Sequence, residues 1–400
     1  MEITGVTTTK VSNESWGEFV EFPLLTIMNK YDEYRNVDGS NPEARRKWMG
    51  PVGDVVVEIE TDTDITGVGI ANWATGAIAT VIDETLSKLV IGEDPLQREK
   101  LWELMYRATL PFGRKGIAID AISAVDTALW DIAGKEANKP VYELLGGPVK
   151  DEIPCYASNL HPVDFDTLEQ EALEYVEKGF DTMKMRFRHG PEAGRAGMKE
   201  NEKIVATVRD AVGDDIDIAA DAYMGWTVRY AKKMTKRLER YEMAWIEEPV
   251  MADNIEGYAE VREAAPMPIS GGEHEFTRWG HKDLLEKEAV DILQPDVGRV
   301  GGISEMKKIA DMAETYDIPV IPHAGTNPTL HLIAASTNAP MAEYFPIPEW
   351  YKEQQDGDST YADAIFENPP SPDDGMIPLP DSPGVGAELN REALEHFALE

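Results

Sequence analysis

Three acidic residues, each placed directly after a short apolar run, are the residues of this chain best suited to chemistry. Asp221 follows IDIAA, Glu247 follows MAWI and Glu273 follows PISGG, and the three positions are evenly spaced along the chain. If these runs are successive parallel strands of a barrel, their carboxylates meet at the face where such barrels hold their active sites. Three carboxylates gathered there predict a site for a hard divalent cation such as Mg²⁺.

A histidine and a further aspartate follow the next two apolar runs. Asp296 comes after DILQP and His323 comes after PVIP. On adjacent strands, the carboxylate can hydrogen-bond to the imidazole, which orients the ring and raises its basicity. We therefore predict that His323 and Asp296 form a catalytic dyad with His323 as the base. Glu248 and His274, next in sequence to two of the acids, are expected to support the metal site.

Three more charged residues are expected at the same face. Lys184 and Arg186 lie two residues apart in TMKMR and so share one face of a strand. They would neutralise the negative charge that develops when a proton leaves a carbon beside a carboxylate. Glu343 ends the eighth run, APMAEYF. Across the mouth of the barrel it could act as a hydrogen-bond donor if a site of low dielectric constant keeps its carboxyl protonated.

The pattern of strands and helices expected around these residues predicts an α/β protein. From residue 153 onward, eight strand-like runs alternate with amphipathic stretches, and none carries a glycine-rich dinucleotide fingerprint. This pattern favours a closed parallel barrel over an open doubly wound sheet. Before it, the runs MEITGVTTTKV, VVVEIET and ITGVGI predict an antiparallel sheet, and residues 117–137 have the spacing of a buried helix. The proline-rich tail is expected to return to this first module.

The charge of the chain limits its partners. Lysine and arginine number 38 against 74 aspartates and glutamates, a net charge of −36. Nucleic acids and anionic membranes would be repelled, so we expect a small-molecule partner. The single cysteine, Cys155, cannot form an internal disulfide, and no apolar run is long enough to span a membrane. These features predict a soluble, cytoplasmic protein, and so many acids predict a salty cytoplasm, that of a halophile.

Several longer runs resemble the enolase superfamily, and within it the mandelate racemase subgroup. They are ISAVDTALWDIAGK, PVYELLGG, WIEEP, GGEH, ILQPDVGRVGG and PGVGAELNRE. The resemblance implies a modified TIM barrel, (β/α)7β, over residues 151–345. It also implies an α+β capping domain formed by residues 1–150 and the C-terminal segment 346–400. The roles it implies are Mg²⁺ ligands at Asp221, Glu247 and Glu273, the His323–Asp296 dyad, and an enolate-stabilising glutamate at Glu343.

The resemblance also points to a reaction. Many members of the subgroup carry a second lysine as an opposing base where this chain has Arg186, a poor proton acceptor. Racemisation needs two bases, whereas dehydration of a sugar acid to a 2-keto-3-deoxy acid needs one. QPDVGRVGG and PGVGAELNRE look like the versions found in L-rhamnonate dehydratases, which also lack that lysine. In this group the substrate is contacted by two N-terminal loops, here about residues 13–30 and 36–53, with Arg46 expected to face the substrate.

Other functions fit parts of this pattern. The N-terminal-loop histidine of the L-rhamnonate dehydratases has no counterpart, because the first histidine here is His161. Another aldonate is therefore possible as substrate. A racemase or epimerase of 2-hydroxy acids, a metal-dependent aldose-ketose isomerase and a non-catalytic sugar-acid binder are the alternatives. We also expect a homo-oligomer.

The acidic composition predicts a response to salt. Because scattered acids repel one another and salt screens that repulsion, the thermal unfolding midpoint should rise between low and molar KCl. Differential scanning fluorimetry across a KCl series measures it. A midpoint that stays level or falls would contradict the halophilic interpretation.

Overall fold

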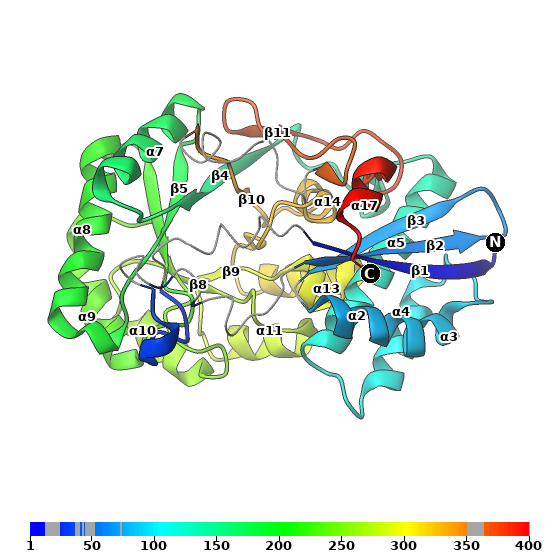
Figure 1. The fold of residues 1–400 in the computed structure, drawn as a ribbon, viewed down its shortest axis with the longest axis horizontal. Helices are drawn as coiled ribbons and strands as arrows, with labels where there is room; N and C mark the ends of the chain where they lie inside the picture. The colour runs from blue at the N-terminus through cyan, green and yellow to red at the C-terminus, as the bar shows by residue number, and fades with distance from the viewer. Residues whose placement is uncertain are drawn as a thin grey trace.

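The computed structural model describes residues 1–12, 25–36, 41, 44, 53–72, 74–349 and 364–399. Figure 1 shows a barrel at the left of the view and an antiparallel sheet with its helices at the right. The C-terminal segment runs across the top between them. Among the described residues, no helix combines the length and the apolar character that crossing a bilayer requires.

The N-terminal unit is the predicted antiparallel sheet covered by helices. Its strands pair in the order β1, β2, β3, and the long helix α5 packs on β3. Gly67 and Gly69 allow this close packing, because a Cβ at either position would run into the helix carbonyl oxygens of Ala128 and Ala124. The bounds are β1 (Ile3–Val11), β2 (Asp54–Thr61), β3 (Thr66–Asn72), α2 (Thr75–Val81), η4 (Ile82–Leu86), α3 (Ser87–Val90), α4 (Arg98–Thr109) and α5 (Ile117–Ala137).

The second unit is the predicted parallel barrel. Its strands run in the order β10, β4, β5, β6, β7, β8, β9. The run expected as the seventh strand forms only two isolated bridges, Leu293 with Val320 and Asp296 with His323. Pro319 and Pro322 explain this, because proline has no N–H to donate to a ladder. The bounds are β4 (Glu152–Leu160), β5 (Thr182–Arg186), β6 (Asp217–Asp221), β7 (Trp245–Glu247), β8 (Ile269–Gly271), β9 (Ile292–Leu293) and β10 (Ala342–Tyr344).

Amphipathic helices follow the strands and cover the outside of the barrel, where their apolar faces bury its outer layer of valine, isoleucine and methionine side chains. Local capping fixes where some of them begin. Asp164, for example, accepts hydrogen bonds from the backbone N–H groups of Asp166 and Thr167 at the start of α7. The bounds are α7 (Phe165–Glu177), α8 (Gly194–Val212), α9 (Val228–Leu238), α10 (Ile255–Ala264), α11 (Thr277–Glu286), α12 (Val297–Val300), α13 (Gly302–Glu314) and α14 (Asn327–Ala335).

Helix α5 joins the capping unit to the barrel segment that follows Asp296. The buried carboxylate of Asp126 accepts hydrogen bonds from the backbone N–H of Ser304 at 2.9 Å and from its hydroxyl at 2.7 Å. Ser123 accepts a bond from the Gly301 N–H at 2.9 Å. Since α12 begins immediately after Asp296, these bonds fix the turn that carries a predicted catalytic residue.

The C-terminal segment returns to the capping unit, as predicted. Strand β11 (Met376–Pro378) pairs with β4, and helix α17 (Arg391–Phe397) lies beside the sheet (Figure 1). Asp131 of α5 accepts hydrogen bonds from the N–H groups of Val68 and Val385, both at 2.9 Å, and so joins sheet and tail. The exact boundaries of the three segments stay predictions.

The close packing of α5 against the start of α13 predicts that a small substitution there lowers the stability of the protein considerably. Gly302 has φ +82°, and an added Cβ would meet the Asp126 carboxylate. Gly302→Ala should therefore lower the free energy of unfolding by about 2–4 kcal/mol, through backbone strain and overpacking. Gly76→Ala is the matched control, since a Cβ there enters open space on a helix. It should change stability by less than about 1 kcal/mol. Equal urea midpoints for the two variants would contradict the packing described.

Candidate active site

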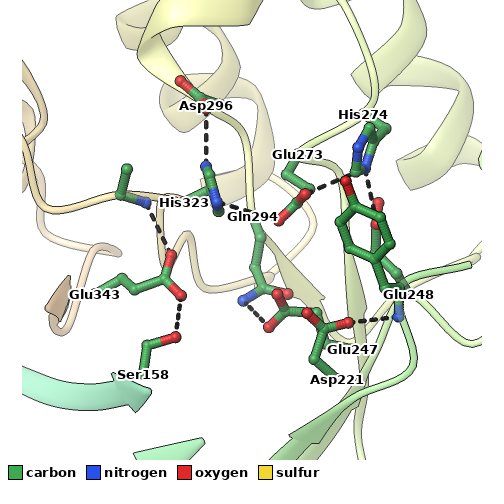
Figure 2. Close-up of polar contacts among 12 residues, drawn as sticks. Ser158, Asp221, Glu247, Glu248, Glu273, His274, Gln294, Asp296, His323 and Glu343 are labelled. Atoms are coloured by element: carbon green, nitrogen blue, oxygen red, sulfur yellow. Dashed lines mark hydrogen bonds and ion pairs between the residues drawn. The ribbon is translucent and has the colours of Figure 1, made fainter. Parts of the chain in front are cut away.

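The three acids predicted as metal ligands lie at neighbouring strand ends. Asp221 ends β6, Glu247 ends β7, and the two are register partners. Glu273 lies two residues beyond the end of β8. All three are buried, and Figure 2 shows their side chains grouped around Gln294, with His323 on the side nearer Glu343. Parallel strands that end at one face place the three acids on the same side of the barrel. Their role as a shared set of ligands stays a prediction, because they are not among the described groups of three whose donor atoms lie within 4.8 Å of one another.

Two buried cations compensate these acids. Lys184 Nζ lies 2.6 Å from Glu247 Oε1 and 2.7 Å from Glu343 Oε1. Burial alone would lower the pKa of Lys184, but these two carboxylates outweigh burial and hold it above its ordinary value. The Arg186 guanidinium pairs with the carboxylate of Asp221. Both side chains therefore remain cationic, and neither is a proton acceptor at neutral pH.

Two further donors orient Glu247. Gln294 Nε2 donates to Glu247 Oε2 at 2.8 Å, and Trp245 Nε1 donates to the same oxygen at 3.2 Å. Burial raises the pKa of Glu247 to about 7, a shift that Lys184 opposes and Asp221 increases. Sequence reasoning missed both donors. The available signals were the strand period, which places Trp245 on the face of Glu247, and the position of Gln294 in DILQPD.

The predicted dyad is formed. His323 Nδ1 lies 2.8 Å from Asp296 Oδ2, and His323 Nε2 lies 3.4 Å from Glu273 Oε2 (Figure 2). Asp296 is itself fixed, because its Oδ1 accepts the Gly298 N–H at 2.7 Å. Burial alone would lower the pKa of His323, but Glu273, Glu343 and Asp296 together raise it to about 9. The Asp296 bond occupies Nδ1 and leaves Nε2 facing the acids.

The expectation that Glu343 is a protonated hydrogen-bond donor is wrong. Its Oε1 accepts from the Ser158 hydroxyl at 2.5 Å, and its Oε2 accepts from the Ala324 N–H at 2.8 Å (Figure 2). Burial raises the pKa of Glu343, but Lys184 and His323 dominate and lower it to about 2. Sequence reasoning counted burial and missed the lysine held against this carboxyl. Glu343 is an ionised partner of Lys184.

A second set of possible metal ligands overlaps the predicted one. Within the described ranges, Glu248, Glu273 and His274 are the three side chains whose donor atoms lie within 4.8 Å of one another. His274 Nδ1 lies 2.8 Å from Glu248 Oε2 and 3.2 Å from Glu273 Oε1. Protonation of His274 suits this arrangement: burial lowers its pKa, but Glu248 and Glu273 outweigh burial and raise it. Through these contacts Glu248 and His274 help to hold the Glu273 carboxylate in position, as expected from the sequence.

Arg299 links the dyad to the metal site and was not identified from the sequence. Its Nη1 donates to the backbone oxygen of Glu273 at 3.2 Å, and its Nε lies 3.5 Å from Asp296 Oδ2. The sequence feature that could have identified it is the arginine in the run VGRVGG, three residues after Asp296.

Most of the two predicted substrate loops, including Arg46, lies outside the described residues. The described end of the first loop reaches the barrel. The Leu25 N–H donates to the Phe187 carbonyl at 2.8 Å, and the Leu25 side chain packs on Gly225. Phe187 directly follows β5 and Gly225 lies beyond β6, so this loop meets the barrel at the face that carries the acids.

Comparisons with known proteins agree with this geometry. Residues 49–146 match the family model described as the mandelate racemase / muconate lactonizing enzyme N-terminal domain. Residues 167–393 match the model described as enolase C-terminal domain-like. The second match alone covers more than half of the 400 residues.

Individual relatives are similar over nearly their whole length. The L-rhamnonate dehydratase of Saccharopolyspora erythraea is 35% identical over 378 residues, 94% of this chain and 91% of the relative. The structure of L-rhamnonate dehydratase from Gibberella zeae has a TM-score of 0.88 at 29% identity, covering 100% of this chain and 96% of that one. The Gibberella zeae enzyme has also been solved in complex with Mg. The 3,6-anhydro-D-galactonate cycloisomerase of Zobellia galactanivorans has a TM-score of 0.82 at 28% identity, covering 100% of both chains.

Two histidines, His323 of the site and His331 of α14 outside it, are expected to titrate in opposite ways in the metal-free protein. His323 should stay protonated up to about pH 9, because the surrounding carboxylates favour the imidazolium. His331 should stay neutral down to about pH 4, because burial disfavours its charged form. NMR titration of ¹⁵N-histidine-labelled protein, with resonances assigned from His323→Asn and His331→Gln, measures both. A pKa near 6.5 for His323 would contradict the arrangement of its carboxylates.

Proposed function

Because the chain belongs to the mandelate racemase and muconate lactonizing enzyme family, we propose that it is a Mg²⁺-dependent dehydratase of a sugar acid. The observation that carries the proposal is an asymmetry in the site. His323, oriented by Asp296, is a base on one side, whereas Lys184 and Arg186 are both held as cations by carboxylates. A single base supports elimination of water and disfavours racemisation, which needs a proton acceptor on each side of the carbon.

The residues present fit the metal. Asp221, Glu247 and Glu273 supply carboxylate oxygens, the donors that Mg²⁺ prefers. Oxygens that already accept one hydrogen bond retain a second lone pair for a cation. The overlapping set with His274 offers a nitrogen donor, which suits Mg²⁺ less well than a third carboxylate does. When bound, Mg²⁺ would draw electron density from a substrate carboxylate and so lower the barrier to loss of the adjacent proton.

His323 then carries the proton through the reaction. Its Nε2, free of the Asp296 bond, accepts the proton from the carbon next to the substrate carboxylate. The electron pair of that C–H bond is delocalised into the adjacent carboxylate of the substrate. Its return to the carbon skeleton forms a C=C bond and expels the β-hydroxyl. The imidazolium returns its proton to this leaving group, so that one molecule of water departs. The resulting enol tautomerises to a 2-keto-3-deoxy acid.

Lys184 and Arg186 stabilise the charge that builds up on the substrate. Lys184 is fully buried between two carboxylates, so its position is fixed before the reaction. Preorganised cations of this kind are worth more in a dry site than in water. In this proposal Glu343 holds Lys184 and the Ala324 N–H in place, and Arg46 contacts the substrate from the second N-terminal loop.

The substrate class follows from the relatives. Two of them are L-rhamnonate dehydratases by name, and an aldonate offers the carboxylate, α-hydrogen and β-hydroxyl that the mechanism needs. L-rhamnonate is therefore the first aldonate to test. The cycloisomerase with the same fold is named for a different sugar acid, 3,6-anhydro-D-galactonate, so the fold alone does not select the sugar.

The proposal predicts that His323→Asn removes activity and leaves metal binding intact. Purified protein is assayed with Mg²⁺ in molar KCl against a library of aldonates, with 2-keto-3-deoxy product as the readout. Loss of the base should lower kcat by at least about 100-fold. Mg²⁺ affinity from calorimetry should stay within a few-fold, because His323 is not a proposed ligand. His396→Asn, an exposed histidine of α17, is the matched control and should keep full turnover.

Other outcomes separate the alternatives. Turnover by His323→Asn equal to that of the unaltered protein would contradict the assignment of the base. Solvent deuterium entering the carbon next to the carboxylate without loss of water would indicate an epimerase. Product from a free aldose only would indicate an isomerase, and Mg²⁺-dependent binding of aldonates without product would indicate a binding protein.

A further inference from the structure

Asp120, in the first turn of α5, is a half-buried acid that the proposed mechanism does not use. Its Oδ1 atom is buried and has no hydrogen-bond partner among the described residues. A carboxylate oxygen without a donor is costly inside a protein, so its presence there needs a physical reason. The groups that lie around Asp120 supply that reason.

The spacing of side chains along α5 places Asp120 against the start of α12, on which α5 packs. Ser123 accepts a hydrogen bond from the Gly301 N–H at 2.9 Å. Three residues further along α5, Asp126 accepts one from the N–H of Ser304, which is also three residues further along the barrel segment. Asp120 lies three residues before Ser123 on the same face of α5. It therefore faces the helix that begins directly after the dyad aspartate.

The charges that act on Asp120 are those of the dyad region. Burial has the largest effect and raises the pKa of Asp120 to about 7; Arg299 opposes this rise, and Asp296 adds to it. Burial alone would lower the pKa of Arg299, but the surrounding acids, Asp296 first and Asp120 among them, raise it. The carboxylate of Asp120 and the guanidinium of Arg299 therefore interact in a region where water screens them little.

Arg299 is the group through which Asp120 reaches the dyad. Its Nε lies 3.5 Å from Asp296 Oδ2, the oxygen that also lies 2.8 Å from His323 Nδ1. A guanidinium drawn closer to this oxygen would weaken the bond between Asp296 and the imidazole, because both donors compete for one negative charge. A second carboxylate beside the guanidinium balances that attraction.

We propose that Asp120 is a positioning residue for proton transfer, which holds the Arg299 guanidinium back from Asp296 and so keeps the bond between Asp296 and His323 strong. The inference rests on the proposed role of His323 as the base. It gives the capping unit a part in the chemistry, since α5 belongs to that unit and the dyad belongs to the barrel. Asp120 acts without touching the substrate.

The first test examines the dyad without turnover. The proton on His323 Nδ1 gives a downfield NMR signal whose position reports the strength of the bond to Asp296. It is recorded for the metal-free, full-length protein at alkaline pH, where Asp120, with its pKa raised to about 7, is ionised. Asp120→Asn keeps the shape of the side chain and removes its charge, so the signal should move upfield. Asp64→Asn, the matched control, removes the same charge from an exposed turn between β2 and β3 and should leave the signal in place.

The second test is kinetic. Asp120→Asn should lower kcat by at least about tenfold, the usual effect of removing a group that orients a catalytic residue, and KM for the aldonate should stay within about threefold. Its unfolding midpoint should not fall, because the substitution removes a buried charge. A purely structural role would instead lower the midpoint and leave kcat unchanged. Adding Asp120→Asn to Arg299→Gln should cause no further loss of kcat, because Asp120 acts through Arg299.

The outcomes separate this inference from the proposed reaction. An unchanged His323 Nδ1 signal in folded Asp120→Asn would overturn the inference, whether or not the protein turns over an aldonate. Independent, additive losses of kcat in the double variant would also overturn it. An upfield shift in a protein that turns over no aldonate would uphold the contact and count against the proposed reaction.

Discussion

The buried ion pairs of Lys184 with Glu247 and Glu343 are the interaction on which the rest of the site depends. Buried carboxylates are costly unless charges of opposite sign lie next to them. Here the compensation comes from Lys184, from Arg186 against Asp221, and from a protonated His323 near Glu273. A divalent cation among the acids would take over part of this role. The imidazole could then lose its proton and act as a base.

The capping unit helps to fix the dyad. Asp296 lies at the start of α12, and the segment after it is hydrogen-bonded to Ser123 and Asp126 of α5. Helix α5 is in turn held by the sheet and by the C-terminal tail through Asp131. The substrate contacts expected from the N-terminal loops and the proton transfer proposed for His323 therefore depend on the same connected set of hydrogen bonds. A static support of this kind is what preorganised catalysis requires.

The sequence predicted the strand-end residues because the carboxyl ends of parallel strands share one face, and that rule places Asp221, Glu247 and the dyad. It did not predict which charges touch. The ionised state of Glu343 depends on Lys184, more than 150 positions earlier in the chain. The donors to Glu247 come from β7 and from the residue that follows β9. Such contacts are set by distances across the barrel. The seventh strand was overpredicted, because apolar character outweighed the two prolines.

The proposed mechanism requires that one divalent cation binds to the carboxylates of Asp221, Glu247 and Glu273. Crystals soaked in Mn²⁺, which takes the oxygen ligands of Mg²⁺ and scatters anomalously, test it most directly. We expect a single anomalous peak in contact with the carboxylates of Asp221, Glu247 and Glu273, within reach of His323. A peak bound instead by Glu248, Glu273 and His274, whose donor atoms lie within 4.8 Å of one another in the described part of the chain, would contradict this expectation.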